Sequence, residues 1–499
     1  MKPQSTTRTQ RSMQHMLLPL TCSLLPIAGV QAAGSPETHT ARKDSRPNVL
    51  IIHCDQLAAW TLGCYGGGGI ETPNIDRLAA EGTLMTNFYA NTPVSTPSRG
   101  CFLSGLYPNE HGAFKNDKQI RQDIPTFASE LRDAGYATGY FGKWHLDGNP
   151  KRPGWDIRGK DMGWTDRTSM YSFGHYKILR KQPGSHPEFG KEVAQTAAEY
   201  PTDWFTDRAM DFMKAHKNRP FCAMLSIPDP HGPYLIRPPY DTMYPPETVE
   251  VPATLTEAPA NDHFFYNESR HKVVDKKSGK TQYEEILQNI RKDKSAYLGE
   301  IKCIDDNVGR IIAFLKKSGL YDKTIIVFTA DHGDMMGEHA RMAKAVPLES
   351  SARIPFIIRY PKLVEQGVRS ECVASCIDFY PTILALTGTT QQGSVSGRSL
   401  APQLSGEQAT WNDEAFLRCY ASVFPWVGIV TKEYKLVYGE KDPDGKGLLI
   451  DRRKDPGERY NCFDDPAYSE VIGQLTDKIV RYCREHQDPH GAWLEKRIH

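Results

Sequence analysis

One stretch limits the fold more than any other. Asn48–His53 is an almost continuous apolar run that stops at Cys54, Asp55 and Gln56. A strand that is apolar on both faces is typical of the interior of a parallel sheet and not of an edge. In such sheets, polar residues at the carboxyl ends of central strands lie where ligands bind. The run therefore predicts a buried central strand with Asp55 and Gln56 at a functional edge.

Strand and helix patterns alternate from this run to about residue 400, which is typical of an α/β domain. The longest helical pattern is Tyr283–Leu315, which carries an apolar stripe. Residues 150–200 and 235–280 show no clear period, and we interpret them as loops. One further strand is expected to end near Gly142, and others are expected at 220–227, 324–329 and 354–358. Further helices are expected after Thr72 and at 124–134, 203–216 and 378–386.

The pattern changes past about residue 405, where short strands precede a last helix. This succession predicts a small antiparallel sheet with a covering helix. The strands are expected at 426–430, 435–438 and 448–450, and the helix at 468–485. We divide the chain into residues 1–32, a main α/β domain at 33–405 and a C-terminal subdomain at 406–499.

The first 32 residues have the pattern of a secretory signal peptide. Lys2, Arg8 and Arg11 precede the apolar run Met16–Val30, and small residues follow up to Ala32. A membrane anchor fits less well, because the run is short and contains two prolines. Cleavage near Ala32 and a secreted or periplasmic protein are expected.

Composition argues against a nucleic-acid partner. Loss of the three cations in residues 1–32 lowers the formal net charge from +1 to −2, and no basic cluster occurs. No second long apolar segment follows, so no membrane partner is expected for the rest of the chain. The cysteines lack the paired spacing of a zinc site. The sequence does not predict the oligomeric state.

Ser95-Thr96-Pro97-Ser98-Arg99 predicts a turn that enters a helix, with the hydroxyls of Ser95 and Ser98 capping its first turn. The stretch also resembles the signature of the sulfatase family, in its serine-type variant. Two further stretches resemble the same family: the start of the helix after Thr72, with the sequence Thr-Pro-Asn-Ile-Asp-Arg-Leu-Ala, and the run Asp455–Glu458. The motifs lie in order between about residues 47 and 465. The resemblance implies an alkaline-phosphatase-like fold: a large mixed sheet between helices, plus the small C-terminal sheet.

A metal site is expected at two strand ends, where Asp55 and Gln56 follow one strand and Asp331 and His332 follow another. Carboxylate and amide oxygens favour Ca²⁺ or Mg²⁺, and a single imidazole does not change that preference. The resemblance implies that these four residues and Ser95 are the metal ligands. Gln56 stands where many members have a second Asp, which leaves one negative charge fewer and weakens the expected affinity.

The resemblance also assigns the catalytic residues. Ser95 would be oxidised to formylglycine (3-oxoalanine) by a sulfatase-maturing enzyme, and the hydrated aldehyde, assisted by Arg99, would attack sulfur. Lys143 and His145, in Gly-Lys-Trp-His, would bind sulfate and assist the hydrate. In the remaining roles, His231 would face the leaving oxygen and Lys344 would hold sulfate.

Three functions remain open at this point. The first is an exported sulfatase that hydrolyses sulfate esters of carbohydrates, with galactose-type or glycosaminoglycan residues as the expected substrates. The second is a phosphatase or phosphodiesterase with unmodified Ser95 as nucleophile, although the motifs give no clear ligand set for a second metal. The third is an inactive binder of sulfated glycans. The expected substrate loops are 146–200 and 232–280. They contain aromatic rings that could stack on sugars or could simply pack the loop, namely Trp155, Trp164, Tyr171, His175 and Tyr176.

Overall fold

A computed structural model gives the arrangement of the chain. The predicted signal peptide and Trp155 lie outside the residues that it describes. The described residues are 45–148, 160–172, 174–180, 188–189, 192–255, 283–407, 409–421, 425–440, 442, 445–489 and 491–498.

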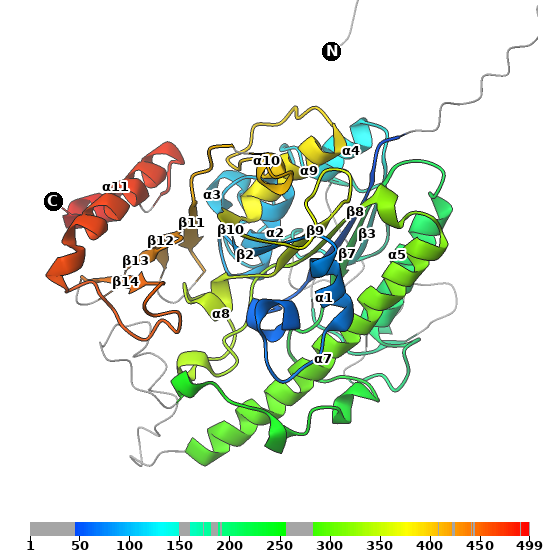
Figure 1. The fold of residues 1–499 in the computed structure, drawn as a ribbon, viewed down its shortest axis with the longest axis horizontal. Helices are drawn as coiled ribbons and strands as arrows, with labels where there is room; N and C mark the ends of the chain where they lie inside the picture. The colour runs from blue at the N-terminus through cyan, green and yellow to red at the C-terminus, as the bar shows by residue number, and fades with distance from the viewer. Residues whose placement is uncertain are drawn as a thin grey trace, which may run out of the picture. The chain divides into compact units, whose positions relative to one another are not determined.

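A mixed sheet of eight strands is the centre of the fold (Figure 1). β1 lies inside it, parallel to β7 on one side and to β8 on the other, as the apolar run predicts. β9 is antiparallel to both of its neighbours, which makes the sheet mixed. The strands in order across the sheet are β10 (Val368–Ser375), β2 (Thr83–Tyr89), β9 (Phe356–Arg359), β8 (Thr324–Ala330), β1 (Asn48–Cys54), β7 (Phe221–Ile227), β3 (Ala137–Lys143) and β4 (Asp166–Tyr171).

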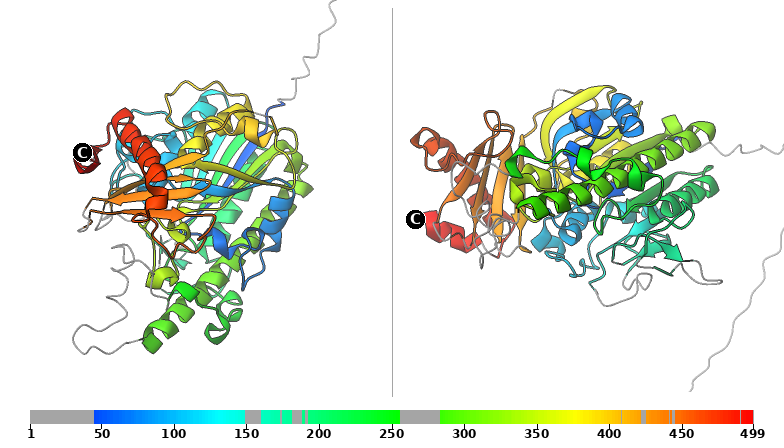
Figure 2. Two further views of the ribbon diagram at one scale, coloured as in Figure 1. Left: turned by 60° about the vertical axis from the view of Figure 1, so that its left-hand side comes forward. Right: turned by 90° about the horizontal axis from the view of Figure 1, so that it is seen from below.

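Helices cover both faces of this sheet, so the predicted α/β class is confirmed (Figure 2). The long α7 packs with two other helices on one face, and a second group packs on the other face through the stacked rings of Phe102 and Phe379. The first group is α1 (Pro73–Ala80), α5 (Pro201–Ala215) and α7 (Tyr283–Lys317). The second is α2 (Ser95–Ser104), α4 (Phe127–Asp133) and α9 (Phe379–Thr387).

Two interpretations of the main domain need correction. The stretch 150–200 is not all loop, because β4 lies within it and pairs in parallel with β3 at the sheet edge. The helix expected at 124–134 begins later, at Phe127, because the Thr126 side chain accepts a hydrogen bond from the backbone N–H of Ser129 (3.1 Å) and caps the first turn.

The C-terminal part is a four-stranded antiparallel sheet with a helix packed on it, as predicted. Its first strand, β11 (Glu414–Cys419), was not predicted; it approaches β10 of the main sheet, and the Arg418 N–H donates to the Asn91 carbonyl (2.7 Å). The other elements are β12 (Trp426–Thr431), β13 (Tyr434–Gly439), β14 (Gly447–Asp451), α11 (Ser469–Glu485) and α12 (Gly491–Ile498). Of the helices that the structure describes, none combines the length and the apolar character needed to cross a bilayer.

Candidate active site

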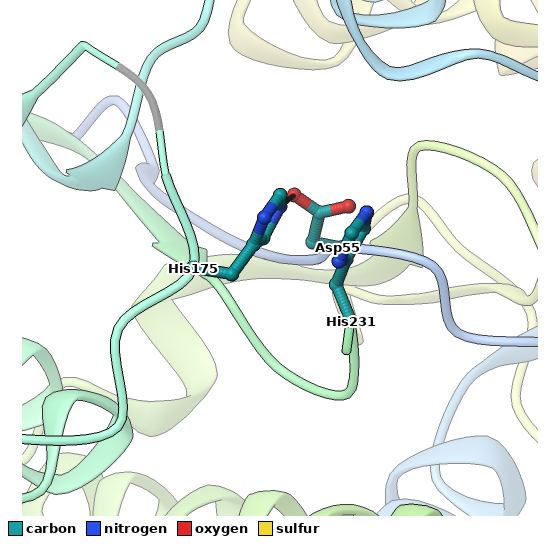
Figure 3. A group of neighbouring side chains, drawn as sticks. All are labelled: Asp55, His175 and His231. Carbon is teal, nitrogen blue, oxygen red and sulfur yellow. Dashed lines mark ion pairs between the residues drawn. The ribbon is translucent and has the colours of Figure 1, made fainter. Parts of the chain in front are cut away.

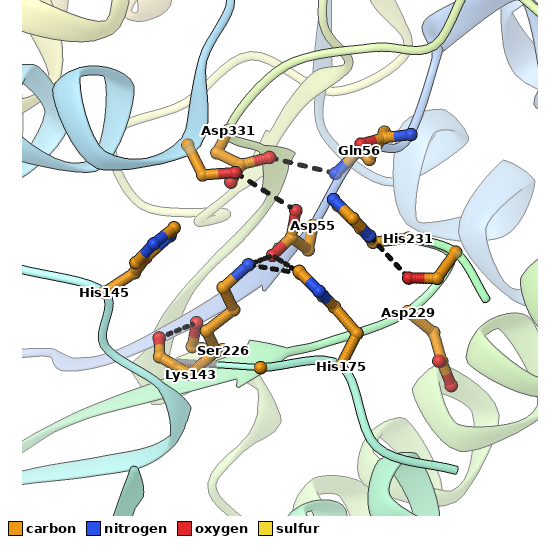
Figure 4. A network of polar contacts seen from close by, with 12 residues as sticks. Asp55, Gln56, Lys143, His145, His175, Ser226, Asp229, His231 and Asp331 are labelled. Atoms are coloured by element: carbon orange, nitrogen blue, oxygen red, sulfur yellow. Dashed lines mark hydrogen bonds and ion pairs between the residues drawn. The ribbon is translucent and has the colours of Figure 1, made fainter. Parts of the chain in front are cut away.

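The two predicted strand ends meet at one edge of the sheet. Cys54 and Ala330, the last residues of β1 and β8, are paired in register, and the Asp331 N–H donates to the Cys54 carbonyl (3.1 Å). The residues that follow, Asp55 and Asp331, therefore leave the sheet side by side. Both carboxylates are fully buried. Figure 4 shows the two side chains next to each other at the ends of their strands.

Three side chains in this edge fit a divalent cation. One ligand atom each from Asp55, Asp331 and His332 lies within 4.8 Å of the others. The His332 Nδ1–H donates to the Gly333 carbonyl (2.9 Å), so the lone pair of Nε2 faces the carboxylates. His332 Nε2 lies 3.5 Å from Asp331 Oδ1 and 4.0 Å from Asp55 Oδ1. Two buried carboxylates and one imidazole are a donor set suited to a hard divalent ion.

Gln56 adopts a left-handed backbone conformation (φ 67°) next to this set. Its N–H donates to Asp331 Oδ1 (2.9 Å), while its side-chain oxygen accepts from Lys344 and its amide nitrogen donates to Asp334. Asp334 also accepts from the Tyr234 hydroxyl (2.8 Å). The carboxamide is thus bonded to Lys344 and Asp334, and its role as a metal ligand stays a prediction.

The signature helix begins at Ser95, but the predicted capping by its serines is wrong. Ser95 Oγ points away from the helix and lies 2.9 Å from His332 Nε2 and 3.5 Å from Asp55 Oδ1. Ser98 Oγ donates to the Asp331 carbonyl. Asn116, which the sequence did not single out, instead accepts from the Thr96 N–H (3.1 Å). The strand-end cluster outcompetes the helix terminus for the Ser95 hydroxyl.

Arg99 forms an ion pair with each of the two buried carboxylates. Its Nη2 lies 3.3 Å from Asp55 Oδ2 and its Nε lies 3.0 Å from Asp331 Oδ2. Nη1 donates to the Lys143 carbonyl (3.1 Å) and to Ser226 Oγ (2.7 Å), which fixes the plane of the guanidinium. Buried carboxylates require such compensation, so Arg99 has a structural task as well as its predicted catalytic one.

The predicted lysines reach the same cluster, and His145 lies at its border. Lys143 Nζ donates to Asp55 Oδ2, and Lys344 donates to Gln56. The backbone carbonyl of His145 accepts from the Thr96 hydroxyl (2.9 Å), and its Nε2 lies 3.6 Å from Asp117 Oδ1.

His231, the last of the predicted catalytic residues, contacts His175, which the sequence pattern does not assign to catalysis. The His231 Nδ1–H donates to the Gly232 carbonyl (2.7 Å). Its ring is stacked on that of His175, with centroids 3.4 Å apart and planes 1° from parallel (Figure 3). His175 Nε2 lies against Lys143 Nζ and 3.5 Å from Asp55 Oδ2. His175 lies in an aperiodic stretch outside every motif. The only signal that the sequence gives for it is a ring that could stack on sugar.

Burial and charge set the ionisation of the site. Burial opposes ionisation of Asp55, yet the charges of Lys143 and Arg99 hold its pKa well below the usual range. Burial lowers the pKa of Lys143 to about 8, although Asp55 acts in the opposite direction. Burial, followed by the charge of Lys344, lowers the pKa of His231 well below its usual value. A cluster of groups with strongly perturbed pKa values is typical of an active site.

The fold and the site define a metal-dependent hydrolase of the alkaline-phosphatase type. The family model described as Sulfatase matches residues 47–389, and one described as N-sulphoglucosamine sulphohydrolase, C-terminal, matches residues 337–485. The chain belongs to the sulfatase family and is a sulfuric ester hydrolase.

Individual relatives and solved structures are similar to the chain over most of its length. An N-acetylglucosamine-6-O-sulfatase of Bacteroides thetaiotaomicron is 29% identical over 93% of this chain and 91% of its own length. A protein solved in complex with its substrate D-glucosamine-2-N,6-O-disulfate is 27% identical, with a TM-score of 0.73 over 89% of this chain and 99% of that chain. A phosphonate monoester hydrolase from Silicibacter pomeroyi is 26% identical, with a TM-score of 0.72 over 88% of this chain and 96% of its own.

Proposed function

We propose that the protein is an exported, formylglycine-dependent sulfatase that removes sulfate from a sulfated sugar. Ser95 is the residue converted to formylglycine. Ca²⁺, or alternatively Mg²⁺, is held by Asp55, Asp331 and His332, with Gln56 and Ser95 as further ligands. The observation that carries the proposal is the direction of the Ser95 hydroxyl, which points into the carboxylate–imidazole cluster instead of capping its own helix.

The bound cation would neutralise charge on the non-bridging sulfate oxygens, and formylglycine would provide the nucleophilic hydroxyl. The chain's own residues prepare this chemistry. His332 holds the lone pair of Nε2 toward position 95, because its Nδ1–H donates to the Gly333 carbonyl. Arg99 forms an ion pair with each carboxylate and fixes their positions.

Lys143 and Lys344 form the proposed cradle for sulfate. Lys143 is buried and Lys344 is half-buried, and both donate to residues of the strand end, Lys143 to Asp55 and Lys344 to the Gln56 side chain. Ammonium groups held in a dry site bind an anion more strongly than exposed ones, because little water competes for them.

His231 is the proposed acid for the leaving oxygen. Its Nδ1 is engaged by the Gly232 carbonyl, so Nε2 is the nitrogen left to carry a proton toward the substrate. A sugar alkoxide is strongly basic and leaves only with a proton, whereas the sulfate group needs no proton from His231. Proton donation at this point contributes about 10²–10⁴-fold in comparable reactions.

A 6-O-sulfated glucosamine derivative is the proposed substrate. The support comes from the two relatives above, one named for N-acetylglucosamine 6-O-sulfate and one solved with a 2-N,6-O-disulfated glucosamine. Substrate loops vary within a fold, so this choice rests on similarity and not on the described contacts.

A phosphonate or phosphate ester hydrolase is the second candidate, because the Silicibacter pomeroyi enzyme shares the fold over most of both chains. Assays with 6-O-sulfated N-acetylglucosamine, nitrophenyl sulfate and a nitrophenyl phosphonate separate the two candidates. Turnover of the sulfates at a far higher kcat/KM supports the sulfatase, and preference for the phosphonate contradicts it.

Mass spectrometry of the peptide that carries Ser95 tests the nucleophile. A mass two hydrogens below that of serine supports the proposal, and an active enzyme with intact serine overturns it. Export is tested by fractionating a host that expresses the full chain. A mature protein that begins near residue 33 in the periplasm or medium is expected, and a full-length protein retained in the cytoplasm contradicts it.

A further inference from the structure

His175 belongs to no sequence motif, yet it contacts two residues of the proposed catalytic set. It lies shortly before the two-residue strand β5 (Leu179–Arg180), and its side chain is 20% exposed. Its Nε2 lies within hydrogen-bonding distance of Lys143 Nζ, and the face of its ring lies on His231. One imidazole thus joins the sulfate-binding lysine to the histidine on the leaving-group side (Figure 4).

The stacking geometry argues against a second metal at this point, although Asp55, His175 and His231 bring ligand atoms within 4.8 Å of one another. An imidazole binds a metal through a lone pair in its ring plane, at about 2.0–2.1 Å. The rings are parallel and 3.4 Å apart, so an ion midway between them would lie about 1.7 Å out of each plane. Lys143 Nζ already contacts both Asp55 and His175, so an ammonium supplies the positive charge here.

A buried ammonium fixes the two histidines relative to each other. Lys177, two residues after His175, donates from Nζ to Asp229 Oδ1 (2.6 Å), Glu300 Oε1 (2.8 Å) and the His231 carbonyl (3.2 Å). The side chains of Lys177, Asp229 and Glu300 are almost fully buried. The segment that carries His175 and the loop that carries His231 are therefore tied to α7 through one side chain.

We infer that His175 is a positioning residue of this sulfatase, which orients Lys143 by accepting its hydrogen bond and orients His231 by stacking on it. The inference rests on the proposed function, in which Lys143 binds sulfate and His231 protonates the leaving oxygen. The two contacts use different parts of the imidazole: the nitrogen serves Lys143 and the ring face serves His231. Substitutions that remove one part at a time should separate the two effects.

His175→Phe retains a ring for stacking and removes the acceptor. Loss of a hydrogen bond to a charged group should raise KM for both 6-O-sulfated N-acetylglucosamine and nitrophenyl sulfate about tenfold, with the ratio of the two kcat values unchanged. The inhibition constant of inorganic sulfate should rise by the same factor.

His175→Gln retains an acceptor at a similar distance and removes the ring. Loss of an aromatic stack should lower kcat on the sugar sulfate about 3- to 10-fold, with kcat on nitrophenyl sulfate within about twofold of wild type. Nitrophenolate leaves without a proton, so the orientation of His231 should matter little for that substrate.

The same substitutions at His216, which packs on Phe212 outside the site, provide the matched control and should leave all constants unchanged. His175→Tyr and His175→Asn repeat the two experiments if a first variant fails to fold. The inference would be overturned if both variants raised KM and lowered kcat equally on both substrates, or if both retained wild-type constants. If the wild type hydrolyses neither sulfate, the proposed function itself has failed; if it is active without the split, only the role of His175 has failed.

Discussion

Ser95 Oγ lies 2.9 Å from His332 Nε2, although the two residues are 237 positions apart in the chain. The contact joins the first residue of α2 to the end of β8, and it exists because β1 and β8 are parallel neighbours whose polar ends project under the start of that helix. Neither residue is accessible to bulk water. The hydroxyl of a serine that caps a helix at the surface would be hydrated. The Ser95 hydroxyl is instead held against the proposed metal ligands, so formylglycine made from Ser95 would lie next to the metal.

The donor set predicts a dependence on divalent metal. Chelation should abolish activity, and Ca²⁺ or Mg²⁺ should restore it, because the carboxylates of Asp55 and Asp331 are the hard ligands of the cluster. Asp331→Ala and Asp55→Ala should behave like the chelated enzyme. Activity and bound metal, measured by elemental analysis, should fall together.

Asp305→Asn is the control for a buried carboxylate outside the site, since Asp305 accepts from the backbone of α1 at Asn74 and Ile75. It should retain metal and turnover once folded. Full turnover in either Ala variant would remove that residue from the metal site.

The nucleophile can be separated from the binding site. Ser95→Ala should lose turnover but still bind the sulfated sugar in calorimetry, because Lys143, Lys344 and the metal ligands remain. Ser95→Cys should be active only in a host whose maturing enzyme accepts cysteine. Ser104→Ala changes a buried serine of the same helix, bonded to the Gly100 carbonyl (2.7 Å), and should stay active. Turnover by Ser95→Ala would exclude an aldehyde made from this residue.

The acids at the strand ends could be predicted from sequence because each follows directly after a continuous apolar run. Strands β1, β7 and β8 are buried on both faces and are read as continuous apolar runs, and parallel pairing then brings their ends to one edge. β4 and β10 could not be found in this way. They lie at the edges of the sheet, are partly exposed and carry polar residues such as Asp166 and Glu371, so they lack the apolar pattern.

His175 and Asn116 illustrate what sequence patterns leave out of the site. Each is placed by contacts with residues distant in the chain: His175 through Lys143 and His231, and Asn116 through the first turn of α2. No spacing or period connects such partners. The sequence assigns the hydroxyls of Ser95 and Ser98 to a cap for the same reason, since the competing acceptors on His332 and Asp331 lie 237 and 233 positions later in the chain.

Lys177 should be a strong determinant of stability. Lys177→Met removes the ammonium between Asp229 and Glu300 and leaves the buried Asp229 carboxylate without its counter-charge, which costs about 3–5 kcal/mol in comparable cases. Denaturant unfolding should report this loss, and adding Asp229→Asn should recover part of it. Lys446→Met, at an exposed pair with Asp464, should cost about 1 kcal/mol or less. Equal costs for the two lysines would contradict the role assigned to Lys177.

Stability should fall in mild acid through His111. This residue is fully buried and accepts from the Ala113 N–H (3.1 Å), and burial lowers its pKa from 6.5 to about 4. Between these values the unfolded chain binds the proton and the folded chain does not, so the free energy of unfolding decreases as pH falls from about 6.5 to about 4. The shift corresponds to about 3 kcal/mol. His111→Gln should flatten this part of the pH profile in denaturant titrations; an unchanged slope would assign it to other groups.

His231 should matter in proportion to the basicity of the leaving group. An alkoxide that leaves a sugar carbon needs a proton, which contributes about 10²–10⁴-fold, whereas nitrophenolate leaves without one. His231→Ala should therefore reduce kcat on 6-O-sulfated N-acetylglucosamine by two orders of magnitude or more, yet reduce kcat on nitrophenyl sulfate only slightly. His216→Ala is the matched control and should leave both rates unchanged. Burial and Lys344 lower the pKa of His231 in the free site, and the negative charge of bound sulfate acts in the opposite direction, so the comparison is made at saturating substrate and matched pH. Equal losses on both substrates would remove His231 from the acid role and leave it as a residue that binds sulfate or supports the His175 ring.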